Sequence, residues 1–207
     1  VKVGVKALEK YLGKERYTFD EANSRNEVGI VRGLAWTSVG GVTLSVEVNV
    51  LPGKGKFELT GQIGDVMKES AQAGISYIRS VAEKYDIRPE FFQENDIHIH
   101  IPEGAVPKDG PSAGITMATA MLSAIVKKPV RADVAMTGEI TLRGRVLPIG
   151  GLKEKLLAAK YAKIQEVLVP AENKADIEEM DDEILHGLKI SFVENMNEVL
   201  HRALTRA

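Results

Sequence analysis

Residues 107–114 read PKDGPSAG and place one serine, Ser112, between turns whose conformations are restricted. Proline fixes its own φ angle and lacks an N–H, so the two prolines limit the chain around residues 108–110. The two glycines permit tight turning and close backbone approach. Apolar residues then recur every three or four positions over 115–125, which predicts an amphipathic helix. We therefore expect Ser112 at or near the N-terminus of this helix.

A serine at a helix N-terminus has two interpretations. It can be an N-cap, whose side chain accepts a hydrogen bond from the first turn. It can also be a nucleophile, because the free N–H groups and the positive dipole end of the helix favour an anion and would serve as an oxyanion hole. The position of Ser112 alone does not separate the two.

A lysine further along the chain favours the second interpretation. Residues 147–159 read LPIGGLKEKLLAA, which predicts a strand end, a Gly-Gly turn and a helix. On that helix Lys155 lies among small apolar residues such as Ala158 and Ala162. Burial without a partner lowers the pKa of a lysine, and the neutral amine can take a proton from a serine. Lys155 could instead extend past the alanines to water, but both signals together favour a Ser–Lys dyad.

Three longer motifs follow one another along the chain. They are PKDGPSAG at 107–114, TGEITLRG at 137–144 and LPIGGLKEK at 147–155. Further segments agree with them: GLAWTSVGG at 33–41, PGKGKFELTGQIGDVMKES at 52–70 and IHIHIPEGAVPKDG at 97–110. With these motifs the chain resembles the proteolytic domain of Lon, the ATP-dependent serine protease, from about Val28 to the C-terminus. The Lys-Asp-Gly-Pro-Ser form is similar to the A-type enzymes of bacteria and organelles.

The resemblance implies a role for each matching catalytic residue. Ser112 corresponds to the nucleophile and Lys155 to the general base, and backbone N–H groups around Ser112 and Ala113 would hold the oxyanion. Thr137 corresponds to a threonine that contacts the catalytic lysine. Asp109 corresponds to an aspartate that can bind the catalytic lysine in inactive conformations.

Two further residues correspond to groups that flank the substrate groove or the dyad, Trp36 and Glu47. Without the resemblance, the residues themselves favour other interpretations. Trp36 would be a core residue, Glu47 a solvated strand position and Thr137 a turn residue.

The resemblance also implies partners and cofactors. The family degrades unfolded or damaged proteins that an ATPase ring feeds to it, which implies a homo-hexamer in the full-length cytoplasmic enzyme. This chain would need no cofactor of its own, while ATP and Mg²⁺ would act through an ATPase module that it lacks. Residues 1–27 would form an N-terminal appendage and linker, the tail of that module, and residues 28–207 the protease domain.

Composition fits a globular domain with a substantial core, since 44% of the residues are apolar. The 27 basic and 29 acidic residues give a net charge of −2, so no nucleic-acid surface is indicated. The absence of cysteine excludes disulfides and a thiol nucleophile. No run of 18 apolar residues predicts a membrane span.

Hydrophobic periodicity predicts mixed strands and helices, hence an α/β (α+β) fold whose sheet order the pattern does not determine. The expected strands are 28–37, 41–51, 55–60, 97–101 and 166–169, with a hairpin formed by 132–137 and 140–149. The expected helices are 5–12, one that begins at Asp65 with Met67, Ala71, Ile75, Ile78 and Ala82 on its apolar face, and 195–205.

Other chemistries have weaker support in the sequence. His98 and His100 point the same way on a strand, but two histidines without a positioned carboxylate or cysteine make an incomplete metal site, so we expect no metal. PGKGK at 52–56 lacks the spacing and hydroxyl of a P-loop, so we expect no ATP hydrolysis by this chain. Two alternatives stay open: a non-proteolytic Lon-like scaffold, and a small-molecule kinase that uses its Gly-rich loop to bind phosphate.

Overall fold

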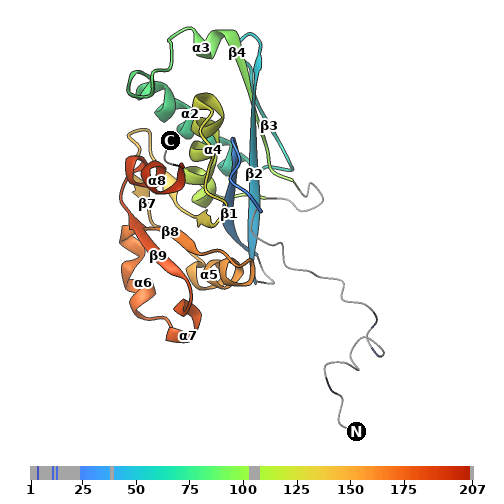
Figure 1. Cartoon of the computed structure of the whole chain (residues 1–207), viewed down its shortest axis with the longest axis vertical. Helices are drawn as coiled ribbons and strands as arrows, with labels where there is room; N and C mark the ends of the chain where they lie inside the picture. Colours follow the sequence, from blue (N-terminus) through green and yellow to red (C-terminus); the bar gives the residue numbers. More distant parts are fainter. Residues whose placement is uncertain are drawn as a thin grey trace.

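One seven-stranded mixed sheet, with helices packed against it, forms the core of the computed structural model, which describes residues 4, 11, 13, 24–37, 40–102 and 108–205 (Figure 1). Its strands are β1 (Ile30–Thr37), β2 (Gly40–Pro52), β3 (Phe57–Thr60), β4 (Asn95–His100), β5 (Val134–Met136), β8 (Glu166–Pro170) and β9 (Lys189–Val193). They lie in the order β3-β4-β2-β1-β5-β8-β9. The short strands β6 (Glu139–Ile140) and β7 (Val146–Leu147) pair separately. The expected α/β class is confirmed.

The helices follow in chain order. They are α2 (Asp65–Ser80), α3 (Phe91–Glu94), α4 (Gly114–Val126), α5 (Leu152–Tyr161), α6 (Lys174–Glu178), α7 (Asp182–Leu185) and α8 (Met196–Ala203). Short 3₁₀ turns connect some of these elements: η1 (Ala82–Tyr85), η2 (Pro111–Ala113) and η3 (Ala171–Asn173).

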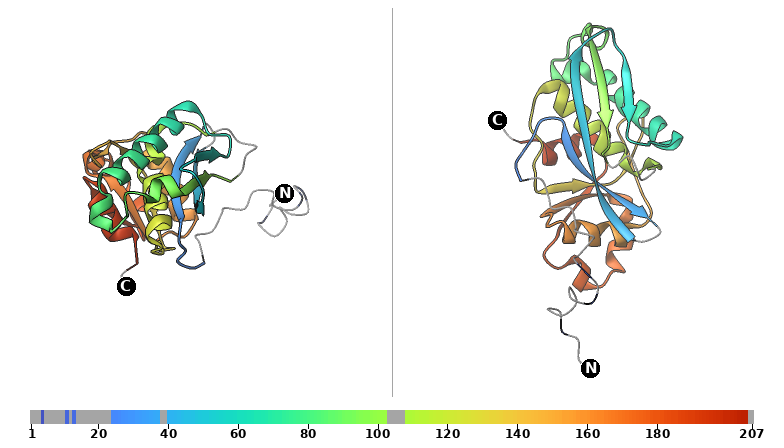
Figure 2. Two further views of the ribbon diagram at one scale, coloured as in Figure 1. Left: turned by 90° about the horizontal axis from the view of Figure 1, so that it is seen from above. Right: turned by 90° about the vertical axis from the view of Figure 1, so that its right-hand side faces the viewer.

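The sheet has a mainly antiparallel half, at whose edge β3 runs parallel to β4, and a parallel half. β2 runs antiparallel to β1 and β4, whereas β5, β8 and β9 continue the sheet in parallel from β1. In Figure 2 (right) the antiparallel strands fill the upper part of the molecule, and the parallel strands lie with α5 below them. The three N-terminal strands and 166–169 agree with the sequence prediction.

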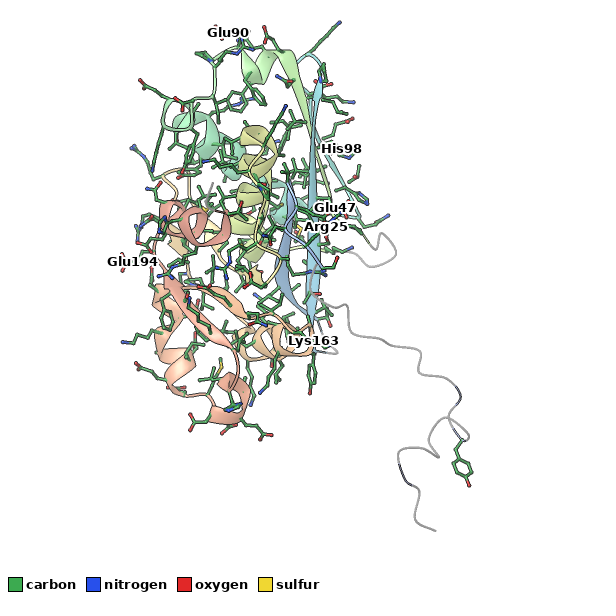
Figure 3. The ribbon with its side chains drawn as sticks, viewed as in Figure 1. Arg25, Glu47, Glu90, His98, Lys163 and Glu194 are labelled. Carbon is green, nitrogen blue, oxygen red and sulfur yellow. The ribbon has the colours of Figure 1, made fainter. Side chains whose placement is uncertain are left out.

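Strand alternation determines which side of the antiparallel half is buried. Ile97 and Ile99 are buried on β4, while His98 and His100 lie on the opposite side. That alternation confirms the strand expected at 97–101. Figure 3 shows His98 and Glu47 on the side of the sheet that faces away from α2 and α4.

The predicted hairpin of 132–137 with 140–149 is wrong. β5 lies inside the main sheet, paired in parallel with both β1 and β8, and all three of its residues are buried. The hairpin is formed by β6 and β7. A continuous apolar strand is typical of a parallel sheet covered on both faces, whereas an edge hairpin would alternate.

The helix after Ser112 is also not amphipathic as expected. Every residue of α4 from Gly114 to Ile125 is buried, because the helix lies between α2 and the sheet. Its polar side chains find backbone partners: Thr119 Oγ1 donates to Ile115 O at 2.7 Å, and Ser123 Oγ donates to Lys128 O at 2.5 Å. A central helix surrounded by protein needs no polar face.

The other predicted helices are largely confirmed. α2 begins at Asp65 and buries Met67, Ala71, Ile75 and Ile78, although Ala82 belongs to the following 3₁₀ turn. The last helix is shorter than 195–205. Asn195 is its N-cap and accepts a hydrogen bond from Glu198 N at 3.2 Å, while Leu204 is already extended.

The expected helix at 5–12 falls almost entirely outside the described residues. The last described part of the predicted appendage packs on the domain. Ala132 N donates to Asn26 Oδ1 at 2.8 Å, and Val130 N donates to Glu27 O at 2.8 Å. The boundary at residue 28 stays a prediction.

Candidate active site

A cleft of about 660 Å³ opens between the end of β1, the turn η2 and the N-terminus of α5. Its lining comes from five separate parts of the chain: Ala35, Trp36, Leu44, Met67, Asp109, Pro111, Ser112, Ala113, Pro148, Ile149, Gly150, Gly151, Glu154 and Lys155. Five of the seven predicted site residues lie in this lining, including Ser112 and Lys155.

The turn that carries Ser112 is held rigidly at its backbone. Gly110 has φ 115°, a value that L side chains rarely adopt, and Pro111 occupies the first position of η2. The carbonyl of Ser112 accepts hydrogen bonds from Gly138 N at 2.8 Å and from Thr137 Oγ1 at 3.3 Å. α4 begins two residues after Ser112, so the serine lies at a helix N-terminus as predicted.

Thr137 is fully buried at the end of β5. Its N–H donates to Leu168 O at 3.2 Å, and its hydroxyl reaches the Ser112 carbonyl. The structure therefore links Thr137 to the backbone of the serine turn. Contact of Thr137 with the lysine, which the resemblance implied, stays a prediction.

Lys155 is the fourth residue of α5 and is only 3% exposed. Leu152, Leu156, Ala158 and Ala159 on the same helix are buried with it. Burial lowers the pKa of the Lys155 amine to about 8, because the charged form loses its hydration. The predicted apolar environment of this lysine is confirmed, and the alternative in which Lys155 extends past the alanines to water is wrong.

Two glycines bring other strands against the start of α5. A side chain at Gly41 would place its Cβ 1.9 Å from the Glu154 carbonyl oxygen, so β2 can reach this turn only without one. Gly151 precedes α5 with φ 65°, and a Cβ there would lie 2.9 Å from Trp36 Cβ. The Gly-Gly turn expected from the sequence thus fits the helix against β1.

The carboxylate of Asp109 binds backbone N–H groups and not the amine of Lys155. Its Oδ1 accepts hydrogen bonds from Met67 N at 2.9 Å and from Gly110 N at 2.8 Å, which places the carboxylate at the N-terminus of α2. These backbone donors lower the pKa of Asp109. Gly64 makes room for it, since a Cβ there would lie 2.3 Å from Asp109 Cγ. In this conformation Asp109 therefore does not bind Lys155.

Trp36 and Glu47 are placed differently from each other. Trp36 lines the cleft with 60% of its surface exposed, so its interpretation as a core residue is wrong. Glu47 is exposed on the outer side of β2 (Figure 3). It is not among the residues that line the cleft. Its solvated strand position agrees with the interpretation from the residues alone.

Several lining residues were not predicted from the sequence. Ala35, Leu44 and Met67 look like ordinary strand and helix residues, and only the pairing of β1 with β2 and the start of α2 bring them here. Pro148 and Ile149 belong to the motif at 147–155, whose Gly-Gly turn was the available signal. Together these residues form the apolar part of the cleft wall.

The described residues contain no cluster of three or more His, Cys, Asp or Glu that could hold a metal ion. Thr60 Oγ1 lies 2.8 Å from His98 Nε2 and 2.7 Å from His100 Nδ1, so the two histidines share a hydroxyl. In the described part of the chain, no helix combines the length and apolar character needed to span a bilayer.

Comparison with known proteins identifies the family of this chain. Residues 2–206 match the family described as Lon protease (S16) C-terminal proteolytic domain. The chain belongs to this family. As a Lon proteolytic domain it is of the serine peptidase class, as the motifs predicted, and the non-proteolytic scaffold is not favoured.

Individual relatives of this Lon proteolytic domain are bacterial. The Lon protease of Lachnoclostridium phytofermentans is 66% identical over 204 residues, which cover 99% of this chain and 25% of that protein. The Lon protease of Clostridioides difficile is 61% identical over 200 residues, 97% of this chain and 25% of that protein. The chain thus spans about a quarter of the length of the curated relatives it matches.

Proposed function

We propose that this domain hydrolyses peptide bonds through an acyl-enzyme on Ser112, with Lys155 as the general base. The neutral amine of Lys155 takes the proton of the Ser112 hydroxyl as its oxygen attacks the scissile carbonyl. The protonated amine then gives this proton to the leaving amine. Lys155, neutral again, activates the water that releases the acyl group.

One observation carries this proposal: Lys155 is 3% exposed, its pKa is lowered to about 8, and it lines the same cleft as Ser112. A lysine with an ordinary pKa of 10.5 would be almost wholly protonated near neutrality and a poor base. Burial among the apolar side chains of α5 gives it the neutral fraction that the chemistry needs.

The turn η2 supports the second requirement of the reaction, which is stabilisation of the oxyanion. The N–H groups of Ser112 and Ala113 lie just before α4, where free donors and the helix dipole favour negative charge. The carbonyl of Ser112 accepts hydrogen bonds from Gly138 N and Thr137 Oγ1, which hold the backbone of this turn in one orientation. We assign the oxyanion to these donors.

Substrates would be unfolded or damaged proteins. The cleft is open, and its lining combines apolar side chains such as Trp36 and Ile149 with polar groups, which suits an extended peptide segment. Supply of such segments by a hexameric ATPase ring, in a cytoplasmic enzyme, is part of the proposal. Because the chain has no P-loop, ATP and Mg²⁺ would act through another module, and no step above uses them.

The test is covalent capture of the serine. A peptide boronate or another serine-directed agent is expected to add once per chain, at Ser112, as measured by intact mass and peptide mapping. Ser112→Ala should abolish the adduct and lower peptide turnover by about 10⁴-fold or more. Ser76→Ala is the matched control, since Ser76 is an exposed serine on α2. Labelling at another residue, or near-normal turnover by Ser112→Ala, would refute the dyad.

A further inference from the structure

A second pocket lies at the beginning of β8 and β9, beside α8, and has a volume of about 450 Å³. Its lining includes three Lys or Arg residues and one carboxylate: Arg131, Glu166, Lys189, His201, Arg202, Leu204 and Thr205. It shares no lining residue with the cleft of Ser112 and Lys155, so the two pockets are separate.

Glu166 is the buried carboxylate of this pocket, and the polar side chains around it bind its oxygens. Its side chain is 3% exposed, and its oxygens accept from Ser191 Oγ at 2.6 Å and from Arg131 at 2.8 Å. Lys189 Nζ lies 3.1 Å from it and an Arg202 nitrogen 3.7 Å. Burial would raise the pKa of Glu166, but the hydrogen bonds outweigh burial and hold the pKa at about 2, so the group stays charged.

Four of the five N–H donors of Arg131 are used in hydrogen bonds within the domain. Its Nε and one terminal nitrogen bind the carboxylate of Asp133 at 3.1 and 2.8 Å. Its other terminal nitrogen binds Glu166 and the Arg202 carbonyl at 2.8 and 3.1 Å. Arg131 is thus a structural residue that is neutralised by its two carboxylates.

Lys189 and Arg202 are different, since most of their N–H donors have no acceptor among the residues that the structure describes. Among the described residues Lys189 forms one ion pair, with Glu166, and its side chain is 63% exposed. Arg202 is 41% exposed, and its nearest side-chain acceptors are Ser191 Oγ at 3.5 Å and Glu166 at 3.7 Å, which is too far for strong bonds. Three cations therefore face two carboxylates, Glu166 and Asp133, which leaves one excess positive charge.

We propose that this pocket binds a phosphate group between Lys189 and Arg202. A guanidinium and an ammonium that a buried carboxylate has already oriented present several donors to one tetrahedral anion. His201 and Thr205 in the lining add further polar groups. Glu166 repels the ligand little, because its oxygens are covered by Ser191, Arg131 and Lys189. The proposal does not depend on the chemistry of Ser112.

The experiment measures the melting temperature of the domain in sodium phosphate and in sodium chloride of equal ionic strength. A ligand that binds only the folded state raises the melting temperature, and we expect phosphate at ~50 mM to raise it by about 5 °C over chloride. The double variant K189Q/R202Q should lose this difference, judged against its own value in chloride. R143Q/K153Q removes the same charge from exposed positions elsewhere and should keep it.

Titration calorimetry with inorganic phosphate and with tripolyphosphate then separates two sources of the anion. Binding of tripolyphosphate that is tenfold tighter or more identifies a phosphate chain, and similar affinities identify a single phosphate group. Either result must disappear in K189Q/R202Q to support the site. An equal melting temperature in phosphate and chloride, or a phosphate effect that survives in K189Q/R202Q, would overturn the proposal.

Discussion

Lys155 and Glu166 are both almost fully buried, at 3% and 2% exposure, yet their surroundings are opposite. Burial is the one cause that shifts the pKa of Lys155, downward to about 8. For Glu166 burial acts against the charge, but hydrogen bonds from Ser191, Arg131 and Lys189 outweigh it and lower the pKa to about 2. Burial thus favours the neutral form of Lys155, whereas the hydrogen bonds of Glu166 keep that residue in its charged form.

This difference indicates that Lys155 has a chemical role and Glu166 a structural one. A buried charge without partners destabilises the fold, so it persists where its reactivity is useful. A buried charge with several donors is a structural element, and removing it leaves its partners uncompensated. The two residues should therefore respond to neutralisation in opposite ways.

Neutralisation of the lysine should give the largest effect. Lys155→Met keeps an unbranched side chain but has no base, and turnover should fall by about 10⁴-fold or more. In the unsubstituted domain, turnover should decrease about tenfold for each pH unit below about 8, as the amine becomes protonated. Rates of peptide hydrolysis from pH 5 to 10, measured for the variant and for the unsubstituted domain, give both the loss of turnover and its pH dependence. A flat profile would contradict the assignment.

The same variant should be more stable than the unsubstituted domain at neutral pH. The folded pKa of about 8 lies below the ordinary 10.5, so protonation costs the folded state about 3 kcal/mol below pH 8. As pH rises from 8 to 10.5 this cost disappears, and the advantage of Lys155→Met should disappear with it. Lys153→Met, at an exposed position two residues away, is the control and should show no such advantage.

Neutralisation of Glu166 should lower the free energy of unfolding instead. Glu166→Gln leaves Arg131, Lys189 and Arg202 without their shared anion, which should cost about 3 kcal/mol at pH 7. Peptide turnover at a temperature where the variant is folded should change little, because Glu166 does not line the cleft. Urea unfolding and peptide hydrolysis on the same samples measure the two quantities.

The pH dependence of this loss has a defined direction. The folded pKa of about 2 lies below the ordinary 4.5, so the stabilisation by Glu166 is complete above pH 4.5 and decreases as pH falls toward 2. The variant and the unsubstituted domain should therefore become alike near pH 2. Glu178→Gln, in an exposed ion pair with Lys174, should cost less than about 1 kcal/mol. An equal cost for both variants would mean that the cluster of Glu166 is not stabilising.

The sequence predicted one of these two regions and missed the other. Lys155 was found because a glycine turn, a helix and a run of alanines are local signals that stand next to it in the chain. The partners of Glu166 come from the segment before β5, from β9 and from α8, and no local pattern connects residues 131, 189 and 202. Their meeting depends on the parallel order of β8 and β9, which periodicity does not determine.

The fold shows the same division. Strands with strict alternation, such as β4, were predicted well because one side faces solvent. The strand β5 and the helix α4 were misjudged because both are surrounded by protein, where a short apolar run does not reveal its partner. Trp36 was misjudged in the other direction, since a large aromatic residue is usually buried, and a cleft that exposes it cannot be read from its neighbours.

Trp36 gives the smallest effect and tests the cleft rather than the charges in it. Its side chain is 60% exposed at the cleft, so Trp36→Ala should change the free energy of unfolding by less than about 0.5 kcal/mol. A peptide that packs on the indole would lose that contact, and kcat/KM should fall by about fivefold, mainly through KM. Tyr161→Ala is the control, because Tyr161 is similarly exposed at 57% but does not line the cleft. If kcat fell while KM stayed constant, Trp36 would act on the geometry of the Ser112 turn rather than on the substrate, and the cleft would need another wall for its peptide.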